Sequence, residues 1–72
     1  MDVDEKIFKL EEALEKIHND IWIIEPQYTS VYRVTCRDWH CWIVDSMIED
    51  HDPEDLAKII TGWRKEKLKD DK

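Results

Sequence analysis

The first twenty-four residues carry the most regular hydrophobic pattern in the chain. Apolar residues recur at alternating spacings of four and three, which is the heptad pattern of a helix that buries one stripe. The stripe consists of Val3, Ile7, Leu10, Leu14, Ile17, Ile21 and Ile24. Pro26 ends the pattern, because the residue before a proline is pushed out of helical geometry. A helix is therefore predicted over residues 3–24.

A helix of that length is roughly 33 Å long at about 1.5 Å per residue. A chain of 72 residues has few other elements with which to cover its apolar stripe, and small domains commonly make up such a deficit with a partner chain. We therefore predict a homodimer that associates through this helix. The predicted seam consists of Ile7, Leu10, Leu14, Ile17 and Ile21. The alternative is that the stripe packs against later helices of the same chain.

Residues 21–24 leave a second interpretation open. Their sequence, Ile-Trp-Ile-Ile, is apolar on every side and rich in β-branched residues, which also suits a short strand. On that interpretation the first helix ends near residues 18–20.

Residues 36–50 are predicted to form a second helix. Thr35 and Asp38 form an Asp-containing variant of a capping box, and apolar residues follow at helical spacing. These residues are Trp39, Trp42, Ile43, Val44, Met47 and Ile48. The alternative is a hairpin that pairs residues 31–36 with residues 39–44. Its two-residue turn, Arg37 and Asp38, lacks the Gly or Asn that tight hairpins favour.

A third helix is predicted over residues 53–68. Asp52 provides an N-cap and Pro53 occupies the first helical position. The predicted fold is a single all-α domain over residues 1–72, with helices near 3–24, 36–50 and 53–68. We expect two copies to join as a homodimeric helical bundle with a coiled-coil seam. An α+β fold with a short hairpin within residues 21–44 is the alternative.

Composition limits the classes of function. With 18 acidic and 11 basic residues the formal net charge is −7, which argues against direct binding to nucleic acid or to an anionic membrane surface. No apolar run exceeds four residues, so no segment is expected to span a bilayer. The acidic N-terminus does not resemble a secretory signal, and two cysteines do not make a disulfide framework. A cytoplasmic protein with free thiols is expected.

Residues 36–41 are the first candidate for metal chemistry. On a helix, Cys36 and His40 would lie one turn apart on one face, a spacing from which two ligands can bind one metal ion. Zinc normally takes four ligands, and His51 or a second copy would have to supply the others. A small zinc-binding domain that uses Cys36 and His40 is therefore an alternative function. In the favoured interpretation no metal or other cofactor is expected.

Catalysis is not expected. The single glycine, Gly62, leaves no Gly-rich loop to stabilise an oxyanion beside a cysteine nucleophile. No pair of carboxylates is recognisable as a general acid and base, because nearly every acid lies in a run with others.

Aromatic and acidic residues indicate a protein partner. Four tryptophans are more than a small helical core obviously needs, and Trp and Tyr dominate the energetics of protein interfaces. We predict a non-enzymatic protein-binding module, a small acidic regulator or inhibitor of adaptor, antagonist or anti-defence type. It would act by stoichiometric binding to a larger protein. The predicted partner surface consists of Tyr28, Trp39, Trp42, Glu49, Asp50 and Asp52.

An acidic DNA mimic that blocks a nucleic-acid-binding protein is a further alternative. Proteins of this kind imitate the phosphate pattern of DNA with carboxylates. Four acids can line one side of the first predicted helix, joined by those of residues 49–55. The four are Asp4, Glu11, Glu15 and Glu25.

Overall fold

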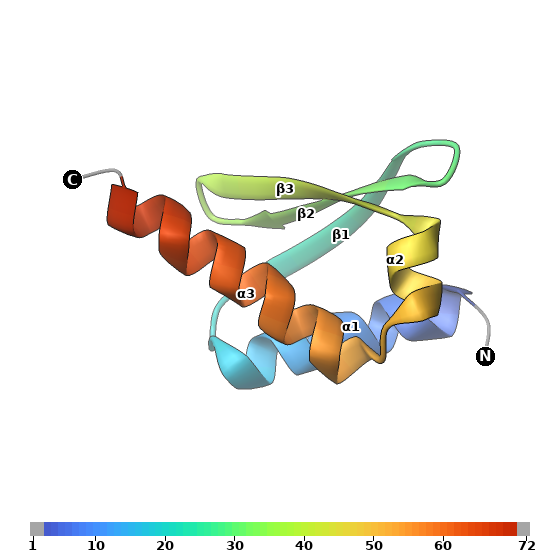
Figure 1. Ribbon diagram of the computed structural model, residues 1–72, viewed down its shortest axis with the longest axis horizontal. Coiled ribbons are helices and arrows are strands. Elements are labelled where there is room, and N and C mark those ends of the chain that lie inside the picture. The colour runs from blue at the N-terminus through green and yellow to red at the C-terminus, as the bar shows by residue number, and fades with distance from the viewer. Residues whose placement is uncertain (1–2, 71–72) are drawn as a thin grey trace.

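A block of three strands separates the N-terminal helix from two C-terminal helices in the computed structural model, which describes residues 3–70 and the side chains of residues 3–68. The elements are α1 (Val3–Ile17), β1 (Trp22–Tyr28), β2 (Val31–Cys36), β3 (Trp39–Val44), α2 (Asp45–Asp50) and α3 (Pro53–Asp70). Figure 1 shows a two-layer arrangement, in which α1 and α3 lie side by side on one face of the sheet and the short α2 joins the layers.

The strands form one antiparallel sheet in the order β1-β2-β3. Because side chains of a strand alternate between the two faces, each cross-strand row belongs to one face. The face turned toward the helices supplies five of the twelve buried core residues, and the three helices supply the others. The buried core residues are Leu10, Ala13 and Leu14 from α1, Trp22, Ile24, Val34, Cys36 and Ile43 from the sheet, Ile48 from α2, and Leu56, Ala57 and Ile60 from α3.

The prediction of an all-α helical bundle with a coiled-coil seam is wrong, and the α+β alternative with a hairpin within residues 21–44 is correct. The helix predicted over residues 3–24 ends at Ile17. Beyond it, the Asp20 carboxylate accepts the Ile21 N–H group at 2.8 Å. Such a local side-chain bond offers the backbone a partner other than the next helical turn. The β-branched residues that follow then enter β1.

The second predicted helix, over residues 36–50, is also wrong in most of its length. Cys36 ends β2, Trp39–Val44 is β3, and the helix is limited to the six residues of α2. The hairpin set aside for want of Gly or Asn is the one that forms, with Cys36 opposite Trp39. Arg37 supplies the turn by adopting a φ of 55°, in the left-handed region that non-glycine residues seldom enter.

The heptad stripe of the first helix is covered within one chain. Leu10 and Leu14 are buried between α1, α3 and the sheet, and Ile7 packs at the edge of the same core. Ile17 and Ile21 are instead 44% and 72% exposed, on either side of the point where the helix ends. The five residues therefore do not form a continuous seam, and the reason for expecting a second copy at α1 is removed. Self-association itself stays a prediction.

Candidate functional site

The face of the sheet turned away from the helices exposes a group of apolar side chains. Three cross-strand rows make up this outer face, which consists of Ile23, Thr35 and His40, then Glu25, Arg33 and Trp42, then Tyr28, Val31 and Val44. The larger apolar side chains are widely accessible, with 46% of Ile23, 73% of Tyr28, 47% of Trp42 and 38% of Val44 exposed. Contiguous exposed apolar surface of this kind is typical of an interaction site.

Trp42 is the centre of the aromatic part of the outer face. Its ring lies 6.5 Å from that of Tyr28 and 5.9 Å, edge to face, from that of His40. Both separations fall in the range of favourable aromatic pairs, so the three rings hold one another in place without being covered. A preorganised aromatic group of this kind loses little side-chain entropy when a partner binds.

The charges on the outer face are paired with each other. Arg33 Nη2 lies 3.4 Å from Glu25 Oε1, across the β1–β2 ladder. Exposed pairs of this kind contribute little to stability, but this one neutralises the row that contains Trp42. The outer face is therefore close to neutral in a protein whose net charge is −7.

The predicted partner residues are divided between two places. Tyr28 and Trp42 lie together on the outer face. Trp39 lies on the opposite face of the sheet, where its ring packs against that of the buried Trp22 at 6.4 Å. The three predicted acids are exposed at the far end of α2 and in the connection to α3. They are Glu49, Asp50 and Asp52.

Three residues of the outer face, Ile23, His40 and Val44, were not predicted as binding residues. Strand alternation places them on one face with Trp42, but the sequence patterns assign residues 21–24 to the first predicted helix and residues 39–44 to the second.

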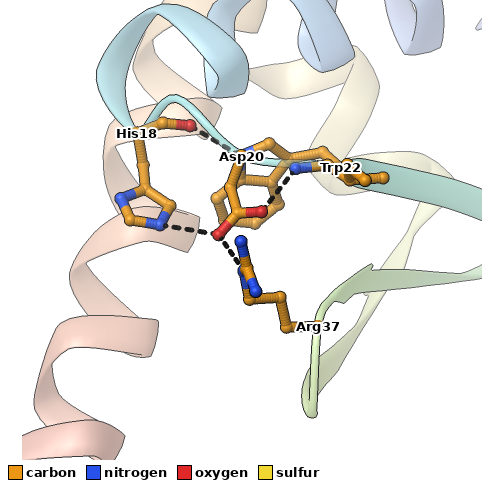
Figure 2. Close-up of polar contacts among 5 residues, drawn as sticks. His18, Asp20, Trp22 and Arg37 are labelled. Atoms are coloured by element: carbon orange, nitrogen blue, oxygen red, sulfur yellow. Dashed lines mark hydrogen bonds and ion pairs between the residues drawn. The ribbon is translucent and has the colours of Figure 1, made fainter.

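A second group of polar side chains joins the end of α1 to the turn between β2 and β3 (Figure 2). Arg37 Nε donates to Asp20 Oδ2 at 2.6 Å, and His18 Nε2 lies 3.4 Å from the same oxygen. The hydrogen bond from Arg37, followed by that from the Ile21 N–H group, lowers the pKa of Asp20. Trp22 Nε1 donates to the His18 carbonyl at 3.0 Å. The hydrogen bond to Asp20 holds Arg37 in place, and Arg37 is the turn residue with a positive φ.

His18, Asp20 and Cys36 bring three ligand-type atoms within 4.8 Å of one another. Two guanidinium groups oppose a cation there, because Arg37 bonds Asp20 and Arg64 interacts with the Cys36 thiol. Both oxygens of Asp20 already accept hydrogen bonds. The group is therefore best explained as a structural link.

Cys36 and His40, the predicted zinc ligands, do not come together. Cys36 is on the inner face and completely buried, whereas His40 is on the outer face and exposed. Side chains on opposite faces of a sheet cannot bind the same ion.

Neither thiol has the environment of a nucleophile. Burial raises the pKa of Cys36, against the opposing effect of Arg64, and burial raises the pKa of Cys41 to about 12. Both cysteines are free and protonated near neutral pH.

A groove of about 430 Å³ lies between α1 and the start of α3. Its lining residues carry charges of both signs and include no aromatic and no large aliphatic side chain, unlike a typical small-molecule site. The lining residues are Lys9, Glu12, Ala13, Lys16, Asp52, Pro53, Glu54 and Asp55. Within residues 3–70 no helix combines the length and the apolar character needed to cross a membrane.

The chain was compared with protein-family models, with curated proteins and with solved structures, and it matches none of them. Its function is therefore inferred from its own surface.

Proposed function

We propose that this chain is a non-enzymatic protein-binding module, a small acidic regulator or inhibitor that binds a larger protein stoichiometrically through the outer face. The single observation that supports this most strongly is the exposure of Trp42 between Tyr28 and His40, on a face that no other described element covers. Two free cysteines support a cytoplasmic location, which is part of the same proposal.

Trp42 has the properties of an interface hot spot. It is an aromatic residue in the middle row of the outer face, on the edge strand β3, and the ion pair of Arg33 and Glu25 lies beside it in the same row. Hot spots are enriched in Trp, Tyr and Arg and lie near the centre of their interfaces. An adaptor or inhibitor needs such a surface and no reactive group, which agrees with two buried or half-buried, protonated thiols.

The acids that suggested DNA mimicry do not form one stripe. Glu11 is partly buried, and its carboxylate accepts the Ile24 N–H group. Glu25 lies on the outer face, paired with Arg33. A mimic needs its carboxylates free and on one surface, so aromatic recognition is the better-supported proposal.

Affinity capture from cells that make the protein tests the proposal. Three tagged baits are used, wild type, Trp42→Ala and Phe8→Ala, and the captured proteins are quantified by mass spectrometry. Phe8 is the matched control, because it is an aromatic residue 63% exposed on α1, away from the sheet. A true partner is retained by wild type and Phe8→Ala and falls at least tenfold on Trp42→Ala, which corresponds to about 1.4 kcal/mol.

The purified partner is then titrated against Glu49→Lys with Asp50→Lys at two salt concentrations. Binding through the outer face should change little, whereas DNA mimicry requires a loss with charge reversal and with added salt. Equal capture by wild type and Trp42→Ala would contradict the proposed function.

A further inference from the structure

The two edges of the sheet differ in how they are protected. Within residues 3–70, the order β1-β2-β3 leaves one edge of β1 and one edge of β3 without a strand partner. Exposed edges invite pairing with another chain, and proteins commonly block them with Pro, bulges, charges or covering elements.

Hydrogen bonding at the end of the β2–β3 ladder shows which residues face the free edge of β3. The Asp45 N–H group donates to the Ser30 carbonyl at 3.0 Å, which marks this pair as hydrogen-bonded. Hydrogen-bonded and non-hydrogen-bonded pairs alternate in an antiparallel ladder. The next pair, Val31 and Val44, and every second pair after it therefore turn their backbone groups away from each other. On β3 the residues with outward backbone groups are His40, Trp42 and Val44.

The same alternation places Trp22, Ile24 and Pro26 at the free edge of β1, and the last two are blocked. The Ile24 N–H group is used by the Glu11 carboxylate, and Pro26 has no N–H group, which is the position that an edge strand tolerates for proline. The register also shifts between Pro26 and Tyr28. The β1 edge is therefore closed by three devices.

Strand β3 itself carries none of these devices. Trp39–Val44 contains no Pro, Asp, Glu, Lys or Arg, and its ladder with β2 is regular. Apolar surface also continues around this edge onto α3. There Trp63, 41% exposed, borders a hollow of about 380 Å³ together with Trp39, His40 and Cys41, and two charged residues, Asp38 and Lys67, complete its lining.

We infer that β3 pairs with β3 of a second copy of this chain, antiparallel about a two-fold axis, to form a continuous six-stranded sheet. All three edge-facing residues find partners when Trp42 lies opposite Trp42 of the second copy and His40 lies opposite Val44. No charged side chain of β3 opposes another in this register, so the net charge of −7 is kept away from the contact. Isologous pairing of this kind closes as a dimer.

The small size of the outer face is consistent with joining two copies at the β3 edge. Three strands about 4.8 Å apart and six residues long at about 3.3 Å per residue cover roughly 300 Å². A standard interface buries about 800 Å² per partner. Joining two copies edge to edge doubles the outer face to roughly 600 Å² and brings the two Trp42 rings together at its centre. The dimer stands independently of the proposed partner, but it would enlarge the surface offered to one.

Sedimentation velocity of the full chain between 1 and 500 µM is the first test. Wild type should approach twice the 8.8 kDa mass of one chain as concentration rises. His40→Pro removes an outward N–H group without touching the β2–β3 ladder, and should weaken association at least tenfold, whereas His40→Ala should not. If the far-UV circular dichroism spectrum shows that His40→Pro is unfolded, Trp42→Lys serves as the second variant. It should also weaken association, because the substituted side chains of the two copies would place like charges opposite each other on the two-fold axis.

Cysteine cross-linking tests the register. A hydrogen-bonded antiparallel pair holds its Cα atoms about 5.5 Å apart, within disulfide range, so Trp42→Cys should form a covalent dimer on mild oxidation. Ile23→Cys is the matched control, since Ile23 is equally exposed on the same face but lies on β1. Wild type, which keeps Cys36 and Cys41, gives the background level.

A wild-type mass of 8.8 kDa throughout the concentration range would overturn the inference. The inference would also be overturned if His40→Pro associated as strongly as wild type and Phe8→Cys on α1 formed the covalent dimer. Neither result would touch the proposed function, which fails separately if capture is insensitive to Trp42→Ala.

Discussion

Alanine substitutions along the predicted heptad stripe distinguish the α+β fold from a fold with one continuous N-terminal helix. Leu14, Ile17 and Ile21 are successive positions of that stripe. In a coiled-coil seam all three would be buried alike, and their replacement by Ala would cost similar amounts. In this structure they are 0%, 44% and 72% exposed, so the costs should fall steeply along the series.

The magnitudes follow from burial. Leu14→Ala removes a fully buried side chain, which costs about 2–5 kcal/mol. Full burial of an Ile side chain is worth about 1.5–3 kcal/mol. Ile17, with roughly half of its surface covered, should therefore cost about 1 kcal/mol, and Ile21 about 0.5 kcal/mol. A domain of this size is stable by roughly 4–11 kcal/mol at about 0.05–0.15 kcal/mol per residue, so Leu14→Ala consumes a large part of the total.

Urea unfolding followed by tryptophan fluorescence measures the free energy of unfolding, with the buried Trp22 as a reporter. Should Leu14→Ala leave no folded baseline, Ile43→Val takes its place, with an expected cost of about 0.5–1.5 kcal/mol. A cost for Ile21→Ala as large as that for Leu14→Ala would refute the break of the helix at Ile17. It would restore the single long helix and the seam that it implies.

Four further predictions concern single residues and salt. Gly62→Ala should stabilise α3 by about 1 kcal/mol, because the added Cβ meets nothing within 4 Å; the melting temperature should rise by roughly 4–8 °C, and no rise would indicate that the helix is frayed there. Burial raises the pKa of Glu11 in the fold, so the folded state binds the proton more tightly than the unfolded state and ionisation at neutral pH is a cost. Glu11→Gln should therefore unfold at a higher temperature than wild type at pH 7, and the difference between the two melting temperatures should narrow as pH falls toward 4.5. A difference that widens as pH falls would contradict a raised pKa for Glu11. Pro26→Val restores an N–H group at the β1 edge and should produce species larger than a dimer in size-exclusion chromatography. An elution profile identical to that of wild type would show that Pro26 does not prevent pairing at this edge. Added salt should strengthen the homodimer, because it screens the repulsion between two chains of charge −7, and weaker association in 0.5 M NaCl would contradict a contact made away from the acids.

The sequence allowed prediction of the first helix and of the last one more reliably than of the segment between them. Asp52 and Pro53 mark the start of α3 because capping and a fixed φ act over adjacent residues. Leu10 and Leu14 fall in the core because helical periodicity places them on one stripe. These features depend on residues that are close together in the sequence, so they can be predicted from one sequence alone.

The hairpin was an alternative that the sequence could not favour over a helix, for two physical reasons. β3 is apolar on both faces, since Cys41 and Ile43 point inward while Trp42 and Val44 point outward, so the period-two signal of a half-buried strand is absent. Its turn residue, Arg37, is held in the left-handed region by the contact with Asp20, seventeen positions earlier. A contact between residues so far apart in the sequence is tertiary, and the turn propensities of single residues do not predict it.

The charge of this protein and its proposed recognition surface lie in different layers. Apart from the pair formed by Glu25 and Arg33, the rows of the outer face contain no charged residue. The acids of α1, α2 and the start of α3 belong to the helical layer and its connections. Net charge of one sign keeps a protein soluble and discourages unspecific contact, while an uncharged edge beside an aromatic face favours one particular contact. The acidic composition that suggested a DNA mimic is therefore better explained as protection of the apolar sheet against unspecific contacts.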